Sequence, residues 1–130
     1  MKYSKLGNSE LEVSNICLGT WPIGGGMGAI EQKDAINAIH ASIDNGINFL
    51  DTAQMYLDSE YILGKAIKGK RNKIILASKL SSWKNINDIE KALENSLKNL
   101  QTDVIDLYQI HSWQESIPME DTFSKLLELK

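Results

Sequence analysis

The sequence predicts an α/β fold with a parallel sheet and crossover helices. Apolar strand-like segments alternate with amphipathic segments of helical period four times along the chain, and this alternation is typical of parallel β/α units. The strand-like segments are almost continuously apolar, which suits a sheet covered on both faces. The length of 130 residues fits one domain, 1–130, made of a hairpin at about 3–14 and β/α units over about 15–130.

The first two segments precede any helix. Apolar residues alternate at Leu11 and Val13, and Gly7 and Asn8 supply turn residues, so residues 3–14 are expected to form a short hairpin. Residues 16–20 follow as a buried strand, and a glycine-rich loop extends over 21–30.

The period then changes to that of a helix. Ala35, Ile36, Ile39 and Ile43 recur at helical spacing, and Gly46 stands where a helix-terminating glycine is expected. The remaining units follow in order. They are a strand at 47–51, a helix capped by Asp58 or Ser59, a strand at 73–79, a helix from Asn87, a strand at 104–111 and a helix beginning near Pro118.

Composition and charge exclude several classes of protein. The formal charge is −3, whereas nucleic-acid-binding domains are basic, so no nucleic-acid partner is expected. No stretch approaches the ~18 apolar residues of a membrane span, and no signal peptide is recognisable, so a cytoplasmic location is expected. Cys17, between Ile16 and Leu18, is expected to be a buried core residue. The histidines and Cys17 show no metal-ligand spacing, so no metal is expected.

Titratable side chains stand at the carboxyl ends of three predicted strands. Asp51 ends the second strand, Lys79 the third and His111 the fourth, and Tyr56 lies in the loop after Asp51. Their spacing matches one β/α unit, so we expect them to meet at one rim of the sheet, where parallel folds place their active sites.

These residue types together can donate a proton. An ammonium beside a phenol favours loss of the phenol's proton, and a carboxylate holds the ammonium in place. A histidine can orient a carbonyl oxygen by donating a hydrogen bond to it. Each of these residue types is usually structural when it occurs alone, and only their matching positions on consecutive units indicate catalysis.

Several motifs resemble those of the aldo-keto reductase family and follow one another in that family's order. They are LGTW at 18–21, GINFLDTAQMY at 46–56, SE at 59–60, LGKA at 63–66, SK at 78–79 and LYQIH at 107–111. The resemblance implies a TIM (β/α)8 barrel, of which these residues form the N-terminal half, and NADPH-dependent reduction of a small-molecule carbonyl substrate.

The resemblance also implies roles for individual residues. Tyr56 would be the proton donor, Lys79 and Asp51 would tune it, and His111 would orient the carbonyl. Gly19, Thr20, Trp21 and Asp51 would contact the cofactor. Trp21, Trp83 and Trp113 each follow a strand and are candidates to line the substrate site, with packing under the loops as the alternative for each.

The chain departs from the family pattern in two respects. Leu57 follows the tyrosine where the family often has glycine. The 130 residues contain neither the nicotinamide contacts of the later strands nor the phosphate-binding segment, so the cofactor site in this chain would be incomplete. We therefore expect residues 1–130 alone to be inactive and to form homo-oligomers through the open half-barrel. The alternative is a non-catalytic half-barrel module, or a cofactor-sensing subunit that works only after assembly with another half.

Overall fold

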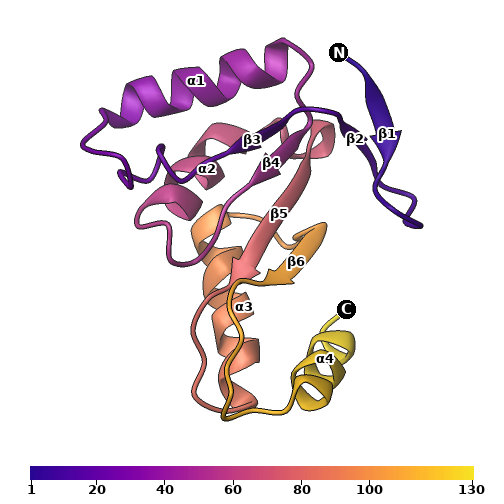
Figure 1. The fold of residues 1–130 in the computed structure, drawn as a ribbon. Coiled ribbons are helices and arrows are strands. Elements are labelled where there is room, and N and C mark those ends of the chain that lie inside the picture. Colours follow the sequence, from indigo (N-terminus) through magenta and orange to yellow (C-terminus); the bar gives the residue numbers. More distant parts are fainter.

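The computed structural model describes residues 1–130 and contains two sheets and four α-helices (Figure 1). The elements, in chain order, are β1 (Tyr3–Lys5), β2 (Glu12–Ser14), β3 (Cys17–Gly19), α1 (Gln32–Asp44), β4 (Phe49–Asp51), α2 (Ser59–Ile67), the 3-10 turn η1 (Arg71–Lys73), β5 (Ile75–Leu80), α3 (Asn87–Leu100), β6 (Leu107–Ile110) and α4 (Met119–Glu128).

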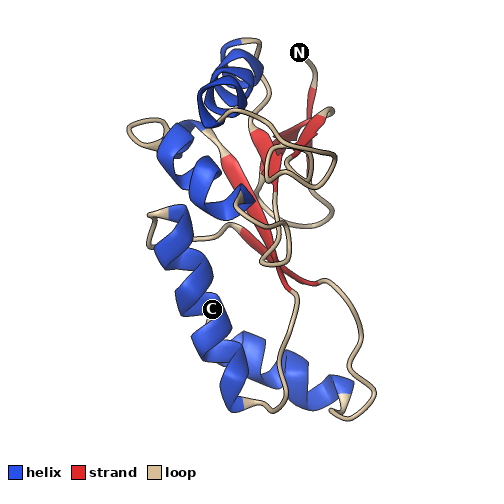
Figure 2. Ribbon diagram, turned by 90° about the vertical axis from the view of Figure 1, so that its left-hand side faces the viewer, coloured by secondary structure: helices blue, strands red, loops and turns tan.

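The main sheet has four parallel strands in the order β3-β4-β5-β6. Each pair of neighbouring strands is joined through a helix, so the predicted parallel α/β fold is confirmed. Figure 2 shows α1, α2 and α3 on one face of this sheet. Their apolar side chains form the main core against the strands, with Ile39, Leu50, Leu63, Leu76 and Leu100 all fully buried.

The hairpin of β1 and β2 is antiparallel and lies at the amino end of the sheet. The Tyr3 hydroxyl donates to the main-chain oxygen of Gly46 at 2.8 Å. The Asn48 side chain accepts from the Ser14 N–H and donates to the oxygen of Glu12. These contacts attach the hairpin just before β4 begins, at the end of the strands opposite Asp51.

The end of α1 shows why a glycine is needed at position 46. Gly46 has φ +87°, a left-handed backbone conformation that residues other than glycine adopt only at a cost in free energy. Its N–H donates to Ile43, and the N–H of Ile47 donates to Ser42, which together satisfy the last carbonyls of the helix. The chain is thereby turned directly into β4.

None of the helices is both long and apolar enough to cross a lipid bilayer.

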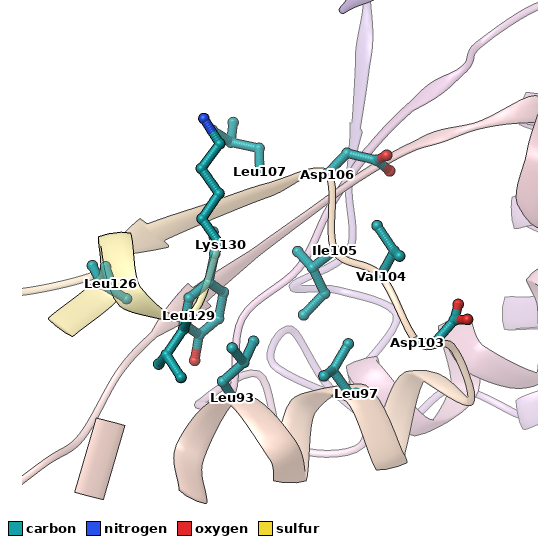
Figure 3. A pocket seen from close by; sticks show the side chains of 11 residues that line it. Leu93, Leu97, Asp103, Val104, Ile105, Asp106, Leu107, Leu126, Leu129 and Lys130 are labelled. Carbon is teal, nitrogen blue, oxygen red and sulfur yellow. The ribbon is translucent and has the colours of Figure 1, made fainter. Parts of the chain in front are cut away.

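A second, smaller core lies between β5, α3 and α4. Leu80, Trp83, Ile89 and Ile117 are buried there, and side chains of α4 pack against them. Beside this cluster, an apolar hollow of about 330 Å³ separates α3 from β6 and the end of α4 (Figure 3). None of the predicted catalytic residues, Asp51, Tyr56, Lys79 and His111, lines this hollow.

The sheet face opposite the helices is partly open, and this corrects the expectation for Cys17. Alternate residues of a strand face opposite sides, so Leu18 points toward the helices while Cys17 points away from them. Cys17 is therefore exposed and is not a core residue. The apolar side chains on this open face are those of Phe49, Ile75 and Leu107, which are half-buried.

Leu57 occupies a position that suits glycine. Its φ is +48° and its side chain is 67% exposed, so little burial offsets the steric cost of the left-handed conformation. Leucine at this position thus places strain in the loop.

We expect Leu57→Gly to raise the free energy of unfolding by about 0.5–1 kcal/mol, the relief of left-handed strain less the greater entropy of glycine in the unfolded chain. Urea unfolding followed by circular dichroism measures this change. Met55→Gly, in the same loop at an exposed position without positive φ, is the matched control and should destabilise. An equal loss of stability in both variants would contradict the strain at Leu57.

Candidate active site

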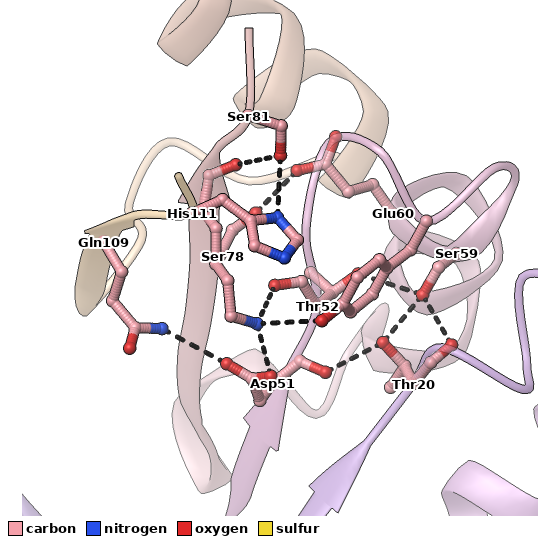
Figure 4. A network of polar contacts seen from close by, with 11 residues as sticks. Thr20, Asp51, Thr52, Ser59, Glu60, Ser78, Ser81, Gln109 and His111 are labelled. Carbon is pink, nitrogen blue, oxygen red and sulfur yellow. Dashed lines mark hydrogen bonds and ion pairs between the residues drawn. The ribbon is translucent and has the colours of Figure 1, made fainter. Parts of the chain in front are cut away.

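The four predicted catalytic side chains converge at one rim of the sheet (Figure 4). The Lys79 ammonium donates to Asp51 Oδ2 at 2.5 Å, to the main-chain oxygen of Thr52 at 2.9 Å and to the Tyr56 hydroxyl at 3.5 Å. The ring of Tyr56 meets that of His111 edge to face, with centroids 5.4 Å apart. The rim therefore places a phenol, an ammonium, a carboxylate and an imidazole in one cluster.

The register of the strands brings these groups together. Asp51 of β4 pairs with Ala77 of β5, and Lys79 lies two residues further along the same face. Lys79 pairs with Gln109 of β6, whose side-chain amide donates to Asp51 Oδ1 at 3.2 Å. Both oxygens of Asp51 are therefore engaged, one by Lys79 of β5 and the other by Gln109 of β6, the next strand beyond it.

The His111 imidazole has a defined environment. Its Nδ1 lies 3.0 Å from Ser81 Oγ, and its main-chain N–H donates to Leu80 at 2.9 Å. Burial and the positive charge of Lys79 lower the pKa of His111, while Asp51 acts in the opposite direction. A lowered pKa favours the neutral imidazole at pH 7, and a neutral ring carries one proton on one of two nitrogens.

A buried cluster of hydroxyl groups lies below the rim. Ser59, the first residue of α2, donates to Thr20 and contacts the Thr52 hydroxyl at 2.9 Å. The Thr20 hydroxyl and N–H both donate to the main-chain oxygen of Asp51. Thr20 is fully buried and its hydroxyl, N–H and main-chain oxygen are all engaged inside the protein, so it supports Asp51. Its contact with the cofactor stays a prediction.

The helix that begins at Ser59 also fixes the Tyr56 loop. The N–H of Ser59 donates to the main-chain oxygen of Tyr56 at 2.9 Å. Gly24, from the loop after β3, approaches the same oxygen so closely that a Cβ there would lie 2.0 Å from it. Asp58 stands at the N-cap but its side chain makes no capping bond, so the hydroxyl of Ser59 and the Gly24 loop define this end of α2.

The three tryptophans differ in their placement. Trp21 is partly exposed and its indole lies edge-on to Tyr56, with centroids 5.0 Å apart. Trp113 is 44% exposed in the loop that follows His111. Trp83 is only 4% exposed and packs in the second core, which agrees with the packing alternative, and its place in a substrate site stays a prediction. Trp83 lies in the loop between β5 and α3, and its indole packs with Leu80, Ile89 and Ile117.

Sequence reasoning missed three polar residues of the site: Gln54, Ser81 and Gln109. Gln109 could have been found, because it lies two residues before His111 and therefore on the inner face of the same strand. Ser81 and Gln54 lie in loops, where side chains do not alternate at the regular spacing of a strand or helix, so the sequence does not show which way they point. The structure brings together no group of three His, Cys, Asp or Glu side chains that could hold a metal ion.

Comparison with known proteins agrees with this geometry. The model of the Aldo/keto reductase family matches residues 15–130. The chain belongs to this family. Aldo-keto reductase YhdN of Bacillus subtilis is 45% identical over 99% of the chain and 43% of its own length.

Two further members show how much of a reductase these residues represent. Methylglyoxal reductase YeaE of Escherichia coli is 38% identical over 94% of the chain and 43% of its own length. A Klebsiella pneumoniae aldo-keto reductase in complex with NADPH superposes with a TM-score of 0.82 at 38% identity, over 91% of this chain and 42% of that one. The chain thus spans less than half the length of these family members, and the four-stranded sheet corresponds to part of their TIM barrel.

We expect Lys79→Met to raise the pKa of His111, because Lys79 lowers that pKa while Asp51 raises it. An NMR titration of the His111 ring protons measures the midpoint. In the unmodified protein the midpoint should lie below about 6.5, the value for a free histidine. The folded state then binds this proton less readily than the unfolded state, so acidification through this range destabilises the fold.

Lys65→Met, at an exposed lysine whose ammonium contacts Gln32 and the ring of Tyr61, is the control and should leave the midpoint of His111 unchanged. An unchanged midpoint in Lys79→Met as well would contradict the assigned electrostatic contact.

Proposed function

We propose that the protein reduces an aldehyde or ketone with NADPH as the reductant. The observation that supports this proposal most directly is the contact of Lys79 with both Asp51 and the Tyr56 hydroxyl, beside the ring of His111. Membership of the family supports the reaction class, and the names of the relatives support carbonyl reduction. The alternative of a non-catalytic module is less favoured, because all four side chains of the proton-donating cluster are present and in contact.

In this proposal Tyr56 gives its phenolic proton to the carbonyl oxygen as that oxygen becomes negative. The Lys79 ammonium, 3.5 Å from the hydroxyl, stabilises the phenolate that remains. Asp51 keeps the ammonium at the rim, and Gln109 holds the second oxygen of Asp51. A carboxylate bound from both sides keeps one geometry, which is what a positioned proton donor requires.

His111 orients the substrate. As a neutral ring it can donate one hydrogen bond to the carbonyl oxygen without adding a positive charge beside Lys79. Trp21, edge-on to Tyr56, supplies an apolar surface beside the donor, and Trp113 is a second exposed indole beyond His111. These aromatic surfaces suit the non-reacting part of a small carbonyl compound.

The residues present fit one side of a nicotinamide site. Gly19 lies on the inner face level with Asp51, and no atom stands within 4 Å of where its Cβ would be. The main chain at Gly19 therefore leaves room for a flat ring such as nicotinamide, and Trp21 and Asp51 lie beside Gly19. NADPH, when bound, supplies the hydride for the carbonyl carbon.

We expect Tyr56→Phe in the full-length protein to lower kcat by about 10²–10⁴-fold, the usual contribution of a positioned proton donor. NADPH affinity, measured by fluorescence titration, should change little because the hydroxyl serves the carbonyl. Tyr61→Phe, which removes a hydroxyl from an exposed tyrosine of α2, is the matched control and should keep normal turnover. Near-normal kcat in Tyr56→Phe would remove Tyr56 from the donor role.

We further propose that a chain of residues 1–130 alone associates through its open sheet. β3 and β6 are edge strands, and Phe49, Ile75 and Leu107 are only half-buried on the face of the sheet away from α1, α2 and α3. Edge strands and apolar faces both favour pairing with another chain, and a two-fold dimer is the simplest such assembly.

Light scattering at micromolar concentration should therefore show this chain as an oligomer, most simply a dimer. Its NADPH-dependent turnover of a simple aldehyde should be close to zero, since these residues supply one side of the site. A monodisperse monomer would overturn the association, and measurable turnover would overturn the inactivity.

A further inference from the structure

The side-chain hydrogen bond of the His111 ring is made to Ser81. Ser81 Oγ lies 3.0 Å from His111 Nδ1 and 3.2 Å from the main-chain oxygen of Lys79. Figure 4 shows Ser81 on one side of the imidazole, with the second ring nitrogen turned away from it. Ser81 thus touches the ring on the side opposite the nitrogen that is free to meet a substrate.

Ser81 is itself held firmly. Its N–H donates to Gln54 Oε1 at 2.9 Å, and Gln54 Nε2 donates to the main-chain oxygen of Ala92 at 2.7 Å. An N–H can only donate and a carbonyl can only accept, so these two partners determine the orientation of the amide. Gln54 therefore connects the loop after β4 to α3 and fixes Ser81 between them.

The Ser81 hydroxyl has one proton and two acceptors within reach. If it donates to Nδ1, the single proton of the neutral His111 ring must be on Nε2. If it donates to the oxygen of Lys79, the hydroxyl oxygen accepts from an Nδ1–H and Nε2 is left without a proton. A carbonyl oxygen only accepts hydrogen bonds, so only the first arrangement allows His111 to donate to a substrate.

We propose that Ser81 is a positioning residue that holds His111 in the Nε2–H form by donating its hydroxyl proton to Nδ1. This inference rests on the proposed function for its consequence, because a ring protonated on Nε2 is the form that binds a carbonyl oxygen. The lowered pKa of His111 agrees with it, since a choice between the two nitrogens exists only while the ring is neutral.

The test compares Ser81→Ala with Ser81→Thr in the full-length protein. A long-range ¹H–¹⁵N spectrum at pH 7.5 reports which ring nitrogen of His111 carries the proton. We expect the Nε2–H form nearly alone in the unmodified protein, a mixture of both forms in Ser81→Ala and recovery in Ser81→Thr. Ser42→Ala is the matched control, since the Ser42 hydroxyl bonds only within α1, and should leave the spectrum unchanged.

Steady-state kinetics form the second readout. Loss of one hydrogen bond of about 1 kcal/mol predicts a fall in kcat of about fivefold to tenfold in Ser81→Ala, with NADPH affinity retained and with recovery in Ser81→Thr. An Nδ1–H ring in the unmodified protein, or an Ser81→Ala spectrum identical to it, overturns the inference. If the unmodified protein reduced no carbonyl compound, the proposed function would fail, and the spectrum would still decide whether Ser81 selects the proton position.

Discussion

The ion pair between Lys79 and Asp51 is the interaction on which the rest of the site depends. Both side chains are largely removed from water, at 15% and 25% exposure, and partly buried charges are stable only when fully hydrogen-bonded. An ammonium has three N–H donors, and Lys79 directs them to Asp51, Thr52 and Tyr56. The arrangement connects β4 and β5 to the tyrosine loop, and loss of Asp51 would leave the charge of Lys79 without its counter-ion.

The position of Tyr56 depends in turn on the core. Its main-chain oxygen accepts from the first N–H of α2, and α2 is anchored by buried side chains such as Ile62 and Leu63. A loop residue that lies outside any strand is thereby located by a helix packed on the opposite face of the sheet. The core thus contributes to the geometry of the candidate site as well as to stability.

The regular elements and the rim residues could be predicted from the sequence, whereas side-chain directions in loops could not. Asp51, Lys79 and His111 were found because strand ends recur once per β/α unit and parallel strands share a rim. Nothing in the neighbours of Trp83 shows that its indole packs in the second core. Cys17 was misassigned because its apolar neighbours face the other side of the sheet. Ser81 gave no signal at all, since its importance lies in one contact made across a loop.

The hydroxyl groups of the buried cluster below the rim are bonded to one another. The Thr20 hydroxyl donates to the main-chain oxygen of Asp51, Ser59 donates to the hydroxyl or the main-chain oxygen of Thr20, and the Thr52 hydroxyl is then the donor to Ser59. Each bond polarises the next, which makes the chain of three cooperative. Replacing any one of these residues would therefore change how much a replacement at the other two lowers the free energy of unfolding. The three positions form one epistatic unit, and selection is expected to exchange them together rather than singly.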